Sequence, residues 1–227
     1  MSTEETPPAP SPRTTVKRSP QRGRYDRETV NAIFDEALIC HVGFVEDGSP
    51  FVIPTIHARV GDVLYFHGSP ASRMLRLMKK GTEVCVTATL VDGIVVARSA
   101  FNHSLGFRSA MVIGPARLVD DSDESAIALE AITDAVLPGR WAEARPPSRN
   151  EDKGTLVVAV PIDEYSAKVR GNEVSDRSED YDLPIWAGAI PLSVIVGAPE
   201  PDDRNLPGVE IPESVKAFVA SHIPFEE

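Results

Sequence analysis

Hydrophobic residues recur at helical spacing near the start of the chain. Between Tyr25 and Ala37, apolar side chains stand three or four positions apart, at Val30, Ile33, Phe34 and Ala37. This spacing puts them on one face of an α-helix, so we predict a short helix over residues 25–37.

The pattern then changes to short apolar runs that predict strands. Leu38–Val45 and Phe51–Arg59 are separated by Glu46-Asp47-Gly48-Ser49. An Asp-Gly turn between two apolar runs predicts a β-hairpin. Pro54 has no amide hydrogen to donate, so its position in the second run indicates an edge strand or a bulge.

Further strands alternate with two helices. One helix is predicted after Gly68-Ser69-Pro70 and ends at Gly81, and another runs from the acidic cap Asp120–Glu124 to about Val136. The other apolar runs predict strands over Val63–His67, Glu83–Leu90, Ile94–Phe101 (after a turn at Asp92-Gly93), Phe107–Val119 and Gly154–Val169. Because helices occur only as connections, the expected fold is mainly β, an antiparallel β-barrel with α-helical connections.

Composition excludes several classes of partner. The net charge of −11 argues against general binding to nucleic acid or to anionic membranes. No apolar run approaches the ~20 residues of a membrane span, and the first 24 residues lack the apolar region of a secretory signal. Cys40 and Cys85 both lie in apolar runs, so we expect buried thiols and a cytoplasmic protein.

The charge distribution divides the chain into three parts. Residues 1–24 hold five Lys or Arg against two Asp or Glu, together with five prolines, which predicts a disordered basic tail. Residues 25–192 form the expected β-barrel domain. Residues 193–227 are rich in proline and acidic side chains, and we expect this extension to wrap the surface.

The first candidate site is the segment between a predicted strand end and a predicted helix start. It reads His67-Gly68-Ser69-Pro70-Ala71-Ser72-Arg73. A helix N-terminus offers free backbone amides, serine adds hydroxyl donors, and arginine adds a forked cation, so the segment suits a phosphate group. The alternative is that Ser69 is only a helix cap and Arg73 a solvated surface cation.

Two more polar clusters could contribute to a site. Arg98-Ser99 opens a twelve-residue stretch that also holds His103 and Arg108, although ordinary polar loops have similar compositions. Lys168 and Arg170 end the last predicted strand, before a loop that carries Trp186. Tryptophan stacks on planar rings or packs at subunit interfaces, and the alternative is a buried core residue.

Other chemistries find no support in the sequence. It contains no phosphate loop, no dinucleotide-binding glycine motif, no nucleophile elbow and no zinc-binding spacing. His57 and His67 flank a hairpin and could approach each other, but two candidate ligands are a weak basis for a metal site, and we predict none.

Several segments together resemble the flavin-nucleotide-binding branch of the split barrels that are similar to pyridoxamine 5'-phosphate oxidase, a branch that includes nitroimidazole-reductase-like proteins. The resemblance covers residues 25–192. It is carried by Phe51-Val52-Ile53-Pro54-Thr55, Val63–Arg73, Val91–Ser104, Pro138-Gly139-Arg140-Trp141, Arg145-Pro146-Pro147, Ser166–Gly171 and Trp186-Ala187-Gly188.

The resemblance implies a homodimer with flavin mononucleotide (FMN) sites at the subunit interface. A strand backbone would lie along the flavin ring, here at Ile53, Pro54 and Thr55. The strand-to-helix turn would hold the phosphate, and the partner subunit would close the site. The implied residues are His67, Gly68, Ser69, Ser72 and Arg73 for the phosphate turn and Lys168, Arg170 and Trp186 for the closing group, with Arg98 and Ser99 as further cofactor contacts.

The expected function is an FMN-dependent oxidoreductase that acts on a small, planar, oxidised organic molecule. The flavin performs the redox chemistry, so no catalytic side chain is assigned, and His67 and His103 are the candidate proton donors. The alternatives are a non-catalytic flavin-binding or sequestering protein, or the same fold with a deazaflavin or haem. Vitamin B6 oxidation is not expected, because the C-terminal arginine–histidine arrangement of authentic oxidases is not found.

Overall fold

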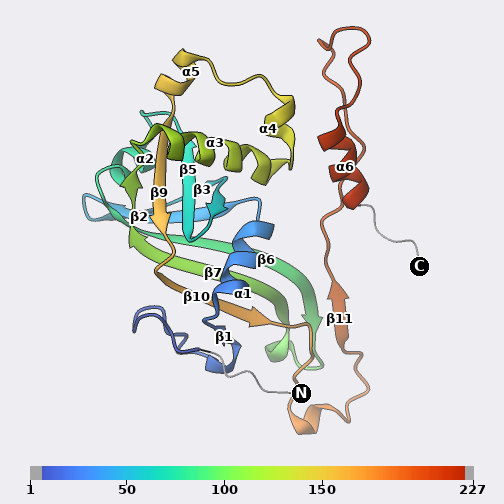
Figure 1. Ribbon diagram of the computed structural model, residues 1–227. Coiled ribbons are helices and arrows are strands. Elements are labelled where there is room, and N and C mark those ends of the chain that lie inside the picture. Colours follow the sequence, from blue (N-terminus) through green and yellow to red (C-terminus); the bar gives the residue numbers. More distant parts are fainter. Residues whose placement is uncertain (1–6, 223–227) are drawn as a thin grey trace.

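The computed structural model describes residues 7–222 (Figure 1). The strands are β1 (Gly23–Arg24), β2 (Cys40–Glu46), β3 (Ser49–Thr55), β4 (Ala58–Val60), β5 (Val63–Gly68), β6 (Glu83–Val96), β7 (Ser104–Pro115), β8 (Arg117–Leu118), β9 (Leu156–Pro161), β10 (Glu164–Arg170) and β11 (Gly188–Pro191). The α-helices are α1 (Arg27–Glu36), α2 (Arg73–Met78), α3 (Ser122–Val136), α4 (Arg140–Glu143), α5 (Arg149–Gly154) and α6 (Glu213–Ser221).

The strands form two antiparallel sheets. The larger sheet has seven strands in the order β1-β10-β7-β6-β2-β3, with β11 paired to the outer part of β6. The smaller sheet has four strands in the order β4-β5-β9-β8. In Figure 1 the helix α1 lies against the strongly curved larger sheet, and α3 crosses the smaller one. The fold is the expected mainly β split barrel.

Three of the predicted strands are each broken into two, and the two halves lie in different sheets. The predicted strand over residues 51–59 is divided between β3 and β4, that over 107–119 between β7 and β8, and that over 154–169 between β9 and β10. A buried residue stands at each break: His57, Ala116 or Ile162. The apolar pattern therefore continues through the corner, which is why the sequence showed one strand where there are two.

The predicted turn at Asp92-Gly93 is wrong, because β6 continues through these residues. Its pairing with β7 shifts register between Val91 and Gly93, which marks a β-bulge at Asp92. The Asp92 carboxylate binds Arg108 at 2.8 Å, and its carbonyl oxygen accepts a hydrogen bond from the Leu192 amide at 3.1 Å. The bulge thus fixes the start of the C-terminal segment rather than reversing the chain.

Two hydrophobic clusters hold the domain together. The larger one joins α1 and α2 to both sheets, through side chains such as Ile33, Leu75 and Val86. The smaller one lies under α3 and contains Ile132. The predicted helices α1 and α3 are confirmed, each capped by an aspartate, Asp26 and Asp121, whose side chain accepts backbone amide hydrogens. Among residues 7–222, no helix is long and apolar enough to cross a membrane.

The described part of the N-terminal segment makes specific contacts with the barrel. Arg13 binds Glu83 at 2.9 Å and Glu164 at 2.7 Å, and Thr14 is buried. The short strand β1 pairs with β10 at the edge of the larger sheet. Residues 7–24 are therefore attached to the barrel, while residues 1–6 of the expected disordered tail lie outside the described part of the chain.

The C-terminal segment leaves the barrel after β11 and returns at α6. Residues 193–212 are almost entirely exposed between these two attachments, and in Figure 1 they rise beside the domain. The helix α6 is held by Glu143 of α4, which accepts hydrogen bonds from the Ser214 amide at 3.0 Å and from the Ser214 hydroxyl. We call residues 188–222 the C-terminal arm.

Candidate functional site

The predicted phosphate turn lies between β5 and α2. The helix begins at Arg73, later than predicted, and its cap is Ser72, whose Oγ accepts from the Leu75 amide at 3.5 Å. Ser69 is not the cap, because its carbonyl accepts from the Ser72 amide at 2.9 Å and forms a turn before the helix. Its Oγ accepts from the Ala71 amide at 3.2 Å.

Arg73 connects this turn to the edge strand β3. Its guanidinium lies 4.5 Å from the centre of the Phe51 ring and 3.2 Å from the carboxylate of Glu46. The strand β3 pairs only with β2 among the described residues, which confirms the edge position that Pro54 predicted. Ile53, Pro54 and Thr55 thus lie on an edge strand, and Phe51 of the same strand contacts Arg73, the first residue of α2.

The second cluster is organised by a carboxylate that the sequence did not single out. The side chain of Asp176 is fully buried and accepts from the Arg98 amide at 3.0 Å and from the Arg98 guanidinium at 3.3 Å. These hydrogen bonds, the backbone one foremost, lower the pKa of Asp176. The Ser99 Oγ accepts from the Phe101 amide at 3.2 Å. Arg98 and Ser99 therefore hold their own loop together.

The third cluster lies at the far end of the larger sheet. Arg170 donates to the Leu105 carbonyl at 2.9 Å, and Lys168 pairs with Ser109 in the ladder of β10 and β7. Trp186 is 67% exposed, so it is not a core residue. In the sheet order, β10 is separated from β3 by three strands, and none of the side-chain interactions found in residues 7–222 joins this cluster to Arg73.

A cavity of about 500 Å³ adjoins His67, at the end of β5. The ring Nδ1 of His67 is buried and has no hydrogen-bond partner among the described residues. Burial lowers the pKa of this imidazole, so the ring is neutral at pH 7. A neutral imidazole that adjoins a cavity without a fixed partner is free to bind a ligand or a metal ion.

The opposite wall of this cavity comes from the segment between α3 and α5. Arg140, Trp141 and Arg145 line it, and Trp141 donates its backbone amide to Asp134 of α3 at 2.8 Å. Arg140 is 3.7 Å from Glu143, whereas Arg145 forms a bidentate pair with Glu151 at 2.6 and 2.8 Å. The cavity therefore combines an imidazole whose Nδ1 has no partner, an aromatic ring and two cations with three carboxylates, those of Glu143, Glu151 and Asp152.

Sequence reasoning did not select these three residues as site residues. A tryptophan and two arginines within six positions, just after Pro138-Gly139, were the available signal. Gly139 adopts a φ of 80°, which only glycine adopts at low cost, and this conformation turns the chain back from α3 across the cavity. These residues lie in the connection between α3 and α5, which shows no periodic hydrophobic pattern, so the sequence did not single them out.

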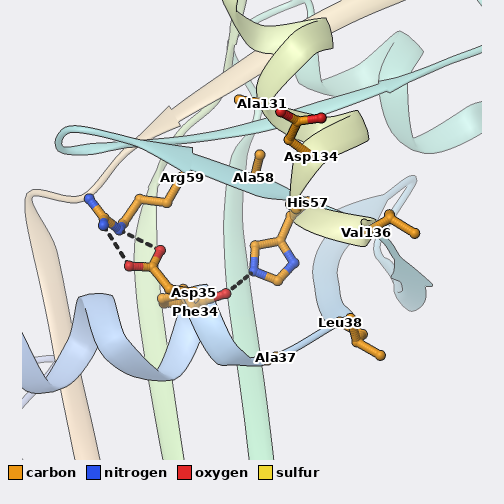
Figure 2. A pocket seen from close by; sticks show the side chains of 11 residues that line it. Phe34, Asp35, Ala37, Leu38, His57, Ala58, Arg59, Ala131, Asp134 and Val136 are labelled. Atoms are coloured by element: carbon orange, nitrogen blue, oxygen red, sulfur yellow. Dashed lines mark hydrogen bonds and ion pairs between the residues drawn. The ribbon is translucent and has the colours of Figure 1, made fainter. Parts of the chain in front are cut away.

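His57 and His67 do not form a shared metal site. His57 lies in a separate, smaller cavity on the other side of α3, where it binds the Phe34 carbonyl (Figure 2). Within residues 7–222, no group of three or more His, Cys, Asp or Glu side chains is arranged to hold a metal ion.

Comparison with known proteins places this chain in a family. The family model described as pyridoxamine 5'-phosphate oxidase matches residues 26–169. The chain belongs to the pyridoxamine 5'-phosphate oxidase family. The match starts at the cap of α1 and ends within β10, so it spans both sheets of the split barrel.

Within this family, two solved structures resemble the chain over most of its length. The flavocytochrome Anf3 from Azotobacter vinelandii is 44% identical, with a TM-score of 0.88, over 93% of this chain and 98% of that one. The FAD and heme binding protein from Mycobacterium smegmatis is 36% identical, with a TM-score of 0.83, over 86% and 96%.

The description of a third similar structure mentions nitroimidazole, as did the resemblance found in the sequence. It is described as a 5-nitroimidazole antibiotic resistance protein from Bacteroides thetaiotaomicron and is 25% identical, with a TM-score of 0.56, over 65% of this chain and 86% of that one. No curated protein sequence matches the chain significantly.

Proposed function

We propose that this protein is a flavin-binding redox protein that also holds a haem group in the His67 cavity. The observation that carries the haem assignment is the His67 imidazole, which is neutral, adjoins a cavity of about 500 Å³ and has a buried Nδ1 without a partner. The two relatives that resemble the whole chain are described as a flavocytochrome and as a FAD and heme binding protein.

The residues around the cavity fit a haem group. The neutral imidazole of His67 would offer a nitrogen ligand to the iron, and Trp141 would offer an aromatic face. Arg140, with only a 3.7 Å ion pair to Glu143, has donors for a propionate carboxylate. When bound, haem supplies one-electron redox chemistry. The protein holds the ligand ring neutral by burying it, which keeps its nitrogen available to iron.

The flavin belongs at the edge strand β3. The side of β3 that does not pair with β2 suits the edge of a flavin ring, and Arg73 suits a phosphate. Arg73 would exchange its pair with Glu46 for the stronger charge of the phosphate. The resemblance in the sequence implies FMN, whereas one relative is described as binding FAD, and the mass of the released flavin distinguishes the two.

A homodimer would complete the flavin site. In one chain β10 is separated from β3 by three strands, so a second copy would bring Lys168, Arg170 and Trp186 towards a flavin on β3. The arm offers a surface for that copy, since it exposes large apolar side chains: Val194 81%, Ile195 73%, Leu206 74% and Val209 63%. Exposed apolar patches of this kind mark protein interfaces.

An oxidoreductase that passes electrons from the flavin to a small planar organic molecule is the second candidate function. The pairing of Arg73 with the edge strand β3 favours it, because this group of residues needs no haem. A flavin-sequestering protein would use the same residues. Turnover of nitro and quinone acceptors by the reduced protein separates the enzyme from the sequestering protein.

The first experiment is the absorption spectrum of the purified protein, alone and after titration with haemin and with FMN or FAD. We expect a Soret band and flavin bands that saturate independently. His67→Ala should abolish the Soret band, and His103→Ala, on an exposed loop, should alter neither the Soret band nor the flavin bands. Saturable haem uptake by the His67→Ala variant equal to that of the unmodified chain would refute the haem site.

A further inference from the structure

Glu143 of α4 connects the C-terminal arm to the wall of the His67 cavity. Its side chain lines the cavity together with that of Arg140, three residues earlier on the same helix. The same carboxylate accepts hydrogen bonds from the Ser214 amide at 3.0 Å and from the Ser214 hydroxyl, at the start of α6. The helix α4 contacts both α3 and α6, and it stands between them in Figure 1. A one-turn helix therefore joins the cavity to the arm.

The start of α6 depends on this carboxylate. The cap position of α6 is Pro212, whose side chain cannot accept a hydrogen bond, so the first amides of the helix need an acceptor from elsewhere. Glu143 supplies that acceptor. Ser214 is buried, and its Cβ lies 3.9 Å from the position that a Cβ would occupy on Gly139. The contact between α6 and α4 is therefore close, and it leaves little room for a larger side chain.

Arg140 is only loosely paired with Glu143. Their charged atoms are 3.7 Å apart, too far for a hydrogen bond, although residues three apart on a helix are neighbours. The other arginine of the cavity, Arg145, is held by Glu151 in a bidentate pair. Because Glu151 and Asp152 also bring negative charge to the wall, the binding of an anionic group in the cavity depends on Arg140.

Ser214 and Arg140 compete for the same carboxylate. While α6 is docked, Ser214 holds Glu143, and the guanidinium of Arg140 keeps its donors for the cavity. When α6 detaches, Glu143 loses both hydrogen bonds, and the neighbouring guanidinium replaces them as its donor. The ion pair then neutralises Arg140, so the cavity loses the cation that an anionic ligand needs.

We propose that Glu143 is a two-position switch that couples the C-terminal arm to the His67 cavity. A docked arm favours a ligand that carries a carboxylate. Such a ligand in turn favours docking, because it occupies Arg140 and leaves Glu143 to Ser214. The arm thus regulates the cavity in which we place haem, and the propionates as the carboxylates rest on that proposed function. The switch itself belongs to the protein without a ligand, and it is tested there first.

Ser214→Leu displaces α6 without adding charge. Leucine lacks the hydroxyl and cannot fit against Gly139, so protease cleavage within residues 193–212 should speed up. Ser221→Leu makes the same change at an exposed position of α6 and is the matched control, with cleavage at the original rate. Unaltered cleavage of Ser214→Leu would contradict the proposal, because α6 would then not depend on its contact with α4.

Quenching of Trp141 fluorescence reports the state of Arg140, the adjacent residue of the cavity wall. The chain has two tryptophans, so every variant also carries Trp186→Phe. Acrylamide measures the exposure of the ring, and iodide also responds to the local charge. We expect the ratio of iodide to acrylamide quenching to fall in Ser214→Leu and to stay unchanged in Ser221→Leu. Faster cleavage with an unchanged ratio would mean that the wall only opens, and the switch would be wrong.

Haemin titration tests the coupling to the ligand. We expect Ser214→Leu to bind haemin at least ~5-fold more weakly, and haemin to slow cleavage of the arm in the unmodified protein by the same factor. Glu143→Ala also frees the arm but cannot neutralise Arg140, so it should bind haemin more tightly than Ser214→Leu. Equal affinities in these two variants would overturn the switch. No haemin uptake by the unmodified protein, together with the expected quenching ratio, would refute the haem site alone.

Discussion

Asp134 of α3 accepts a hydrogen bond from the backbone amide of Trp141 at 2.8 Å. The helix α4 has Gly139 at its cap position, with no side chain to accept from its first amides. Asp134 supplies that acceptor from the preceding helix, in place of the usual capping side chain. One carboxylate thus fixes the wall of the His67 cavity and stands on the rim of the His57 cavity.

Removing this carboxylate should loosen the wall that carries Trp141. We expect Asp134→Ala to lower the free energy of unfolding by about 1 kcal/mol, as for one lost hydrogen bond, and to weaken haemin uptake. Asp134→Asn retains an acceptor oxygen and should lose less of both. Chemical denaturation and haemin titration measure the two effects, and equal losses in both variants would show that the charge matters more than the hydrogen bond.

Arg73 should contribute to flavin binding through the phosphate. Arg73→Ala is expected to weaken the affinity by about 1.5–3 kcal/mol, the usual loss for a hydrogen bond to a charged group. Arg76→Ala removes a cation from the same helix at an exposed position and serves as the control. Fluorescence titration with FMN and with FAD measures both variants. An unchanged affinity in Arg73→Ala would rule out the phosphate turn.

Stability should fall as the pH drops below the ordinary histidine pKa of 6.5. Burial lowers the pKa of His57 and of His67 in the folded protein, so the unfolded chain takes up protons first. Their contribution to stability is fully present above pH 6.5 and is lost as the pH falls from there through the lowered pKa values. Each group adds a slope of at most about 1.4 kcal/mol per pH unit.

Urea denaturation between about pH 5 and pH 8 tests this dependence. His57→Gln keeps an amide donor for the Phe34 carbonyl but cannot take up a proton, so its stability should fall less steeply with acid. His103→Gln changes an exposed histidine and should keep the original slope. The assignment to buried imidazoles fails if His57→Gln has the same slope as the unmodified protein.

The C-terminal arm should be released when Glu143 is changed. Its carboxylate accepts two hydrogen bonds from Ser214 at the start of α6, and these bonds lower its pKa. In Glu143→Ala we expect α6 to detach and protease cleavage within residues 193–212 to speed up. Glu130→Ala removes an exposed carboxylate from α3 and is the matched control. Unaltered cleavage of Glu143→Ala would mean that other contacts hold α6.

Local sequence signals predicted most elements because local physics decides them. The Asp121 cap of α3, the Asp-Gly hairpin before β3 and the edge position of Pro54 each depend on a few neighbouring residues. The breaks at His57, Ala116 and Ile162 could not be predicted, since burial at a corner gives the same apolar pattern as burial within a strand. Only the contacts between the two sheets distinguish a buried corner residue from a buried residue within a strand.

The candidate site was predictable where it is contiguous in the sequence. The turn from His67 to Arg73 is one segment, and the arrangement of Arg73 against Phe51 brought it to the predicted strand β3. The partners of Arg98 could not be found in the same way, because Asp176 stands 78 positions later. The wall of the His67 cavity depends on Asp134, whose role becomes visible only when α3 and α4 are folded against each other.

The three broken strands also determine how cooperatively the protein unfolds. Each corner ties one sheet covalently to the other within a few residues, at positions spread from His57 to Ile162. Neither sheet corresponds to a continuous stretch of chain that could be expressed alone, and both must form before either core cluster is closed. We therefore expect the barrel to unfold in one cooperative transition, with the sheets losing their protection from hydrogen exchange together.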